Sequence, residues 1–228
     1  MAANIIGLAN KGLNRKLWLE FPELIECVKK DYVRAGALWG GAHSFLHALM
    51  VAQYAWIIAE DEKTGRLAWV AGLCHDINRH FPKKVDKKLQ TYLSFTKFSD
   101  KDKHSIIEAI KKHSKINNPG DGPVTLTLKD ADRLANIGPS HWVRDGQFRP
   151  RAPFVDPIQW LNDPKANFKY PGSVIKCVWY TLEWESWLRL PEAKKIAKPY
   201  FAATRWFLKT TKKQLEEVKL FPLPKELR

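Results

Sequence analysis

The stretch that decides the fold is Ala68-Trp69-Val70-Ala71-Gly72-Leu73-Cys74-His75-Asp76-Ile77-Asn78-Arg79-His80. It is a mostly apolar run, long enough for a buried helix, that ends in an imidazole and a carboxylate side by side. Burying His75 and Asp76 costs free energy unless each finds a partner. A divalent cation would satisfy both at once, so the stretch predicts a metal site at the end of a core helix. Pro82 follows shortly, which is consistent with a helix end here.

Two further histidines, His43 and His47, lie upstream in residues 43–59, a segment that is apolar nearly all round. Such a segment is typical of a central helix. Residues four apart share a helix face, so the two imidazoles suit a pair of metal ligands, or one ligand and its supporting group. They also suit two core histidines that bond to the backbone, and this helix alone favours that second interpretation.

Helical periodicity separates two histidines downstream. Ile106, Ile110 and His113 lie on one stripe, because they are spaced four and then three residues apart. His104 lies nine residues before His113, about half a turn out of phase with it. If the isoleucines face the core, His113 ends in the interior and His104 faces solvent. His113 is therefore the better candidate for a functional site.

Two aspartates, Asp130 and Asp132, lie in residues 125–137, where we expect a helix. Residues two apart point to nearly opposite sides of a helix, so at most one of them is expected to bind the same ion. The spacing alone leaves both candidates open.

The predicted fold class is all-α, a single helical bundle with additional C-terminal helices, because strand-like alternation is scarce. The clearest loop is 117–123, which is rich in Asn, Pro and Gly. We expect a long, partly irregular excursion over residues 139–170, with a short helix near 157–161. Two final helices are expected at 173–190 and 192–219.

The predicted organisation has three parts. Residues 1–34 form an N-terminal lead-in with a helix, and residues 35–140 form the core. Residues 141–228 form the loop excursion and the C-terminal helices, which we expect to pack on the same domain.

The composition indicates which partners the chain favours. Its 228 residues include 38 Lys and Arg and 24 Asp and Glu, which gives a formal net charge of +14. This charge favours anionic partners such as nucleotides or nucleic acid, unless it only supports solubility. Charges interrupt every apolar run that could cross a bilayer, and a signal-peptide pattern is missing, so we expect no membrane partner. Three widely spaced cysteines predict reduced thiols and a cytoplasmic location.

Three segments, taken together, resemble the HD-domain metal-dependent phosphohydrolases. The segments are Ser44-Phe45-Leu46-His47-Ala48-Leu49-Met50-Val51-Ala52, Leu73-Cys74-His75-Asp76-Ile77 and Asp130-Ala131-Asp132-Arg133-Leu134. They are similar to the family's first-ligand helix, its His-Asp motif and its last-ligand helix, in that order along the chain. The resemblance covers about residues 35–140.

The resemblance implies a set of metal ligands. They are His47, His75, Asp76 and Asp132. Asp132 is selected over Asp130 because the family's ligand is the aspartate that follows alanine. Two imidazoles and two carboxylates suit one divalent ion, Mn, Fe, Co, Ni or Zn, or Mg with more water. Two-metal members of the family usually show more histidines than this chain has, so one ion is expected.

Further roles follow from the resemblance. The candidate catalytic residues are Asp76, His113 and Arg79. The candidate phosphate-binding residues are Arg79 and His43, with Lys115, Arg133 and Arg144 as further candidates unless these three are only surface charge. The chain lacks the acidic pair that follows the His-Asp motif in guanosine-tetraphosphate hydrolases, which disfavours that substrate. It also has Arg79 where nucleotidase-like members carry a glutamate, which leaves the general acid unassigned.

The resemblance predicts hydrolysis of a phosphate ester or anhydride, with a nucleotide as the expected substrate. Two other functions remain open. The net charge and the aromatic-rich C-terminal region favour a nuclease that cuts single-stranded nucleic acid. A non-catalytic binding module with a structural ion is the third, although a purely structural site has no need of open coordination positions.

Overall fold

The computed structural model describes residues 16–228, and it divides them into two compact units. The first unit holds residues up to 135 together with 189–193, and the second holds 136–188 together with 194–228. The described residues form helices and turns without a strand, which confirms the all-α prediction. Residues 1–15 of the predicted lead-in lie outside the described part, and the packing expected for 141–228 stays a prediction.

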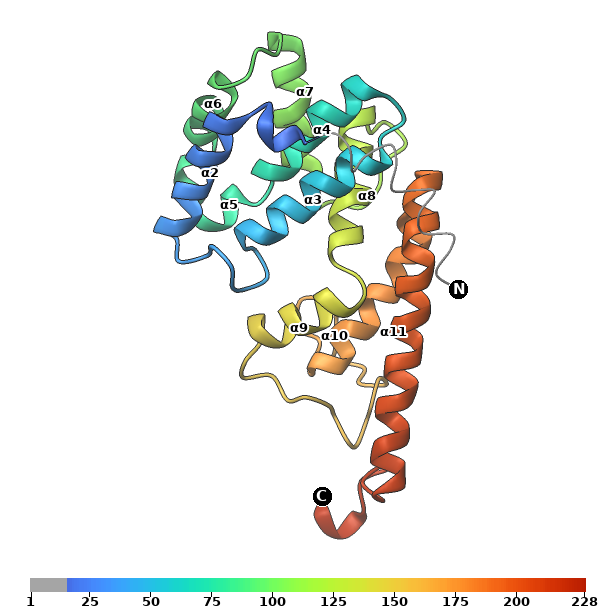
Figure 1. Cartoon of the computed structure of the whole chain (residues 1–228). Coiled ribbons are helices and arrows are strands. Elements are labelled where there is room, and N and C mark those ends of the chain that lie inside the picture. Colours follow the sequence, from blue (N-terminus) through green and yellow to red (C-terminus); the bar gives the residue numbers. More distant parts are fainter. Residues whose placement is uncertain (1–15) are drawn as a thin grey trace. The chain divides into compact units, whose positions relative to one another are not determined.

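The first unit is built from seven α-helices and two short 3₁₀ turns among the described residues (Figure 1). They are η1 (Leu17–Leu19), α2 (Pro22–Arg34), α3 (Phe45–Ile58), α4 (Glu62–Cys74), α5 (Ile77–His80), η2 (Pro82–Lys84), α6 (Val85–Ser94), α7 (Asp100–Lys112) and α8 (Pro123–Ala135).

The second unit contains the remaining elements. They are α9 (Pro139–Phe148), α10 (Val174–Tyr180), η3 (Thr181–Trp187), α11 (Pro191–Glu217), whose first residues are counted with the first unit, and η4 (Lys225–Leu227).

The core of the first unit is the contact between α3, α4 and α8, which lie against one another (Figure 1). Helix α4 is buried along most of its length, as its apolar sequence predicts. Gly72 allows the close approach of α3, because a Cβ on Gly72 would lie 2.8 Å from the backbone N and Cα of Ala52. The absence of a side chain at Gly72 therefore sets how close α4, and the His75 that follows it, lies to α3.

Side-chain caps fix where the functional helices begin. The Ser44 hydroxyl accepts from the backbone N–H of His47, and Asp61 accepts from Thr64 N–H at the start of α4. The Ser99 hydroxyl likewise accepts from Asp102 N–H at the start of α7. Each cap satisfies a backbone donor that the helix itself leaves unpaired. His47 is thus held in the first turn of α3.

The predicted orientation of α7 is confirmed. Ile106 and Ile110 are buried at 0% and 4% exposure, and His113, which follows the helix, is buried at 6%. His104 is exposed. The buried stripe of Ile106 and Ile110 therefore continues to the buried imidazole of His113.

The second unit differs from the sequence prediction over residues 139–170 and at 173–190, where the single helix expected is α10 followed by the 3₁₀ segment η3. Residues 139–148, expected to be irregular, form helix α9, with Pro139 at its first turn, and the short helix expected near 157–161 is a turn instead. Proline is well suited to a first helical turn, where its missing N–H costs nothing. The core of this unit includes Ile175, Val178 and Leu208, against which Trp142 and Phe207 pack.

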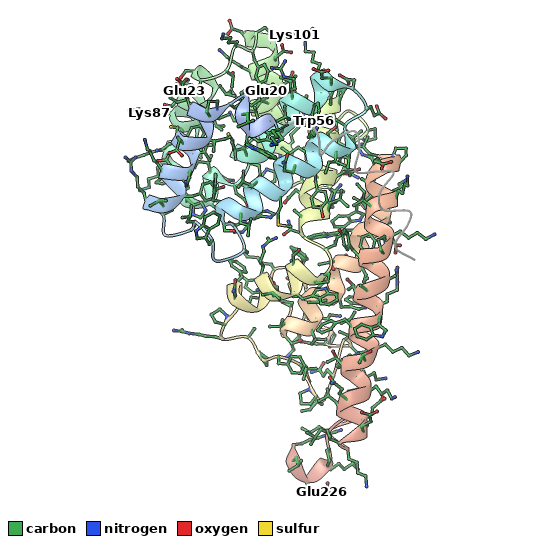
Figure 2. The ribbon with its side chains drawn as sticks, in the orientation of Figure 1. Glu20, Glu23, Trp56, Lys87, Lys101 and Glu226 are labelled. Atoms are coloured by element: carbon green, nitrogen blue, oxygen red, sulfur yellow. The ribbon has the colours of Figure 1, made fainter. Side chains whose placement is uncertain are left out.

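The surface and the thiols agree with the composition. Charged side chains such as Lys87 and Lys101 point outward from the first unit (Figure 2). The three cysteines are free. Among residues 16–228, the helices are all too short or too polar to traverse a bilayer.

Candidate metal centre

Four side chains from three segments of the first unit converge at the end of α4. His47 Nε2 lies 3.3 Å from Asp132 Oδ1 and 3.6 Å from Asp76 Oδ2. His75 Nε2 lies 3.1 Å from Asp76 Oδ2 and 3.7 Å from Asp132 Oδ1. His47 comes from α3, the His-Asp pair follows α4, and Asp132 comes from α8. Residues 85 positions apart in sequence therefore present two imidazole nitrogens and two carboxylate oxygens to one another.

The spacing of these atoms fits ligands of one divalent ion. Ligands held about 2.1 Å from an ion lie ~3.0 Å apart at octahedral angles and ~3.4 Å apart at tetrahedral angles. The four distances, between 3.1 and 3.7 Å, fall around these values. The cluster of His47, His75 and Asp132 is accordingly one that could hold a divalent ion.

Backbone hydrogen bonds select the tautomer of two imidazoles. His75 Nδ1–H donates to the Gly72 carbonyl at 2.7 Å, and His113 Nδ1–H donates to the Ile110 carbonyl at 2.6 Å. In a neutral imidazole, the other nitrogen, Nε2, then carries the lone pair. His75 Nε2 is buried and has no hydrogen-bond partner among the described residues. In the neutral ring this lone pair would be available to a metal ion, with the tautomer fixed by the backbone as is usual for metal-bound histidines.

The charges of the cluster stabilise one another. Burial alone would raise the pKa of Asp76, but the imidazoles of His75 and His43 outweigh it and hold the pKa well below its usual value. Burial opposes the charged form of His75, yet Asp76 and Asp132 outweigh it and raise its pKa to about 9. The pKa of Asp132 is likewise lowered, since His47 and His75 outweigh the effect of burial. Without an ion, the raised pKa of His75 means that its imidazole supplies positive charge beside the two carboxylates.

The profile of the HD domain matches residues 45–137, which include the four converging side chains. This chain contains an HD domain.

Solved structures share the fold of this HD protein. A protein from Lactobacillus plantarum is 19% identical, with a TM-score of 0.64 over 86% of this chain and 98% of its own. YpgQ from Bacillus subtilis, crystallised in complex with ADP, is 18% identical, with a TM-score of 0.65 over 85% of this chain and 93% of its own. The selenomethionine form of YpgQ is 17% identical, with a TM-score of 0.61 over 84% of this chain and 94% of its own. No curated protein sequence matches this HD protein significantly.

Asp130 and Asp132 of the HD domain occupy different surroundings. Asp130 Oδ2 accepts from the backbone N–H groups of Arg189 and Leu190, both at 2.8 Å. Its Oδ1 accepts from Arg133 Nη1 at 3.2 Å. Burial outweighs these donors and raises the pKa of Asp130. The geometry therefore separates the two aspartates that spacing left open, and it brings Asp132 alone to the imidazoles.

His43 and His80 hold the carboxylate of Asp76 in place. His43 Nδ1–H donates to Asp76 Oδ2 at 2.8 Å. His80 Nε2–H donates to the His43 backbone carbonyl at 2.7 Å, and the ring of Tyr32 contacts His80 edge-on at 5.0 Å. His43 thus holds the carboxylate, and His80 holds His43.

His113 lies on the other side of His75. The ring centroids of His75 and His113 are 5.0 Å apart, and the rings are nearly perpendicular. His75, Asp76 and His113 also form a group that could share an ion. Burial, reinforced by the charge of His75, lowers the pKa of His113. The lowered pKa favours a neutral His113 next to the cluster, and its role in the reaction stays a prediction.

Exposure increases from the imidazoles toward one side of the cluster. The side chains of His47 and His75 are 2% and 1% exposed, whereas that of Asp132 is 21% exposed and that of His43 is 32% exposed. Arg79 is the most exposed of the group, at 49%, and its Nε lies 3.7 Å from Asp76 Oδ1. A ligand from solvent would therefore meet Asp132, His43 and Arg79 first.

The other predicted phosphate-binding residues lie in different surroundings. Lys115 is exposed in the turn after α7. Arg133 is buried and donates to Asn117 Oδ1 at 2.8 Å as well as to Asp130. Arg144 belongs to the second unit, where its Nη2 donates to Asn136 Oδ1 at 2.9 Å. Their contacts with a phosphate stay predictions.

Sequence reasoning gave no role to Gly72 or His80, although both lie in the stretch that decides the fold. The signal for Gly72 was a glycine inside an apolar helical run, which often marks a close backbone approach. His80 carried no local signal, because its partner is a backbone carbonyl 37 residues earlier in the sequence.

Proposed function

We propose that this HD protein is a metal-dependent phosphohydrolase that cleaves a phosphate ester or anhydride bond. The observation that carries the proposal is the convergence of His47, His75, Asp76 and Asp132, whose nitrogen and oxygen atoms lie within 3.7 Å of one another in the four pairs described above. These four residues would hold one divalent ion. Their donor set suits Mn, Fe, Co, Ni or Zn, or Mg with additional water.

The chemistry of such an ion fits phosphate hydrolysis. When bound, a divalent ion polarises the phosphoryl group and lowers the pKa of a water molecule toward neutrality. The two carboxylates of the cluster would neutralise its charge, which leaves the site ready to accept an anionic substrate without excess repulsion. Asp76, buried between His75 and His43, would help to orient the water, because its Oδ2 is fixed by the hydrogen bond from His43 Nδ1–H and lies 3.1 Å from His75 Nε2.

Arg79 would bind the substrate phosphate. Its guanidinium is 49% exposed beside Asp76, and a guanidinium can donate two parallel hydrogen bonds to a phosphate. His43, which precedes α3, and a neutral His113, which follows α7, would also contact the substrate phosphate. His113, with its pKa lowered and its Nδ1–H held by Ile110, presents Nε2 as an acceptor for a proton.

The proposed substrate class is a nucleotide. The formal net charge of +14 favours anionic ligands, and YpgQ, which shares the fold, was crystallised in complex with ADP. A nucleotide also offers the ester and anhydride bonds that the metal centre would cleave.

The test is a screen of nucleoside mono-, di- and triphosphates with each of the six metals, following release of phosphate or pyrophosphate. The matched pair of variants is Asp76→Asn beside Asp31→Asn, since both aspartates are buried but Asp31 pairs with Lys88 and Tyr92 rather than with imidazoles. Metal-dependent release by the wild type and Asp31→Asn, but not by Asp76→Asn, supports the proposal. Release that needs no metal, or that survives Asp76→Asn, contradicts it.

A second candidate, a nuclease for single-stranded nucleic acid, is favoured by one feature of the chain. Residues 192–228 carry ten Lys and Arg against four Glu, and the Trp206 side chain in α11 is 65% exposed. Basic groups with exposed aromatics suit single-stranded nucleic acid. Salt distinguishes the two candidates, because nucleic-acid binding weakens steeply with added salt through counterion release, whereas hydrolysis of a small nucleotide responds much less.

A further inference from the structure

A second cluster of metal-ligand side chains lies in the other unit of the chain. His141 and Asp145 are one turn apart on α9, and Cys177 lies in α10. One ligand atom from each residue lies within 4.8 Å of the other two. All three side chains are well buried, with exposures of 9%, 5% and 3%. Helical spacing thus places an imidazole and a carboxylate on the face of α9 that meets a thiol of α10.

The carboxylate of Asp145 is only partly satisfied. Its Oδ1 accepts from the Cys177 thiol at 3.2 Å and lies 3.5 Å from Arg149 Nε. Its Oδ2 is buried and has no hydrogen-bond partner among residues 16–228. A buried acceptor left without a donor destabilises the fold, and more so when the group is charged. A cation beside Oδ2 would remove that cost.

The same three residue types also occur in cysteine nucleophile sites, but the surroundings disfavour that chemistry here. Cys177 is 3% exposed, so a substrate has little access to its sulfur. Burial, together with the charge of Asp145, raises the pKa of the Cys177 thiol to about 12. A reactive cysteine has the opposite properties, partial exposure and a lowered pKa.

We propose that His141, Asp145 and Cys177 bind a divalent ion of intermediate softness, of which Zn²⁺ is the representative, and that this ion joins α9 to α10. A nitrogen, an oxygen and a sulfur ligand suit Zn²⁺ or Co²⁺ better than Mg²⁺ or Ca²⁺, which prefer oxygen alone. Binding releases the thiol proton to solvent, so the ion gains one thiolate and one carboxylate. A water molecule completes a four-coordinate site.

This second site is chemically distinct from the metal centre of the HD domain. The HD cluster contains imidazoles and carboxylates but no thiol, whereas the second cluster contains Cys177. Co²⁺ bound to a thiolate gives a charge-transfer absorption in the near ultraviolet that Co²⁺ bound to imidazole and carboxylate does not give. One probe therefore separates the two sites.

The experiment is titration of the metal-free full chain with Co²⁺, followed by absorption. We expect the thiolate-to-cobalt band in the wild type and in Asp132→Ala, which removes a ligand of the HD centre only. Cys177→Ser should lose the band, and Cys27→Ser, which removes a thiol elsewhere in the chain, should keep it. No band in the wild type, or a band that persists in Cys177→Ser, would overturn the proposal.

Two further variants test the proposal in case Cys177→Ser fails to fold. His141→Asn and Asp145→Asn keep the thiol. Each should lower the Co²⁺ affinity, measured from the thiolate-to-cobalt band, by at least about tenfold, as loss of a ligand or its close support does. Circular dichroism checks that both variants retain the helical spectrum of the wild type. Unchanged Co²⁺ affinity in both folded variants would overturn the proposal as well.

Discussion

The two faces of α8 carry the same residue type and use it in opposite ways. On one face, Asp130 accepts from two backbone N–H groups and from Arg133, so its oxygens are occupied by donors of the protein. On the other face, Asp132 Oδ1 meets the ring nitrogens of His47 and His75 at 3.3 and 3.7 Å. The comparison teaches that the neighbours of a buried carboxylate, more than its burial, decide whether it serves the fold or an ion.

The largest effect is expected from the two carboxylates of the HD cluster, Asp132 and Asp76. Asp132→Ala and Asp76→Ala each remove a carboxylate from the cluster, and we expect hydrolysis to fall by about a thousandfold or more, because polarisation by an ion is worth several kcal/mol. Steady-state rates at saturating metal measure this. Rates within tenfold of the wild type in both variants would show that the carboxylates do not hold the ion.

Replacement of Asp130, on the opposite face of α8, should lower the free energy of unfolding and leave the activity unchanged. Asp130→Ala leaves the N–H groups of Arg189 and Leu190 without an acceptor, which costs about 1 to 3 kcal/mol for each donor that stays buried. Denaturant unfolding measures this loss. The folded variant should keep its metal and its rate. A loss of metal equal to that of Asp132→Ala would remove the distinction between the two faces.

Gly72→Ala tests how closely α4 approaches α3. The new Cβ would lie 2.8 Å from the backbone of Ala52, so the helices must separate, and we expect a loss of about 1 to 3 kcal/mol of unfolding free energy. Since His75 Nδ1–H donates to the Gly72 carbonyl, metal affinity should fall as well. Gly146→Ala is the control, because a Cβ there meets open space. Equal stability of the two variants would contradict the packing account.

The smallest effect is expected at Arg79, the exposed residue beside Asp76. Arg79 and Arg34 are both exposed and both lie three residues after a buried aspartate. Arg79→Ala should raise KM by about tenfold through the lost phosphate contact, at 1.4 kcal/mol per factor of ten, and should leave bound metal unchanged. Arg34→Ala, next to Asp31, should change neither quantity. An equal KM in the two variants would remove Arg79 from the substrate site.

Much of the first unit followed from local sequence pattern. The apolar runs of α3 and α4 and the stripe of Ile106 and Ile110 fix which faces are buried, so the inward position of His113 was predictable from periodicity. The order of the three motif segments was enough to indicate the HD domain. The buried faces depend on residues within a few turns of one another, whereas the HD domain was indicated by the family resemblance of three segments spread over residues 44–134.

The remaining features depend on distant parts of the chain. Spacing could not separate Asp130 from Asp132, because the donors that occupy Asp130 come from Arg189 and Leu190, about 60 residues later in the sequence. Helix α9 was missed because its segment is rich in residues that disfavour helices, and Cys177, which meets it, comes 32 residues after Asp145. Such pairings are set by tertiary packing, which overrides local propensity.

The measurement that tests the central claim most directly is elemental analysis of three purified proteins, the wild type, Asp132→Ala and Asp130→Ala, after loading with the metal that supports activity and removal of excess. The account predicts that Asp132→Ala holds one equivalent fewer than the wild type, while folded Asp130→Ala holds the same amount as the wild type. This difference does not depend on the second cluster, which all three proteins share. Equal metal content in the wild type and Asp132→Ala would contradict the claim that the HD cluster binds an ion.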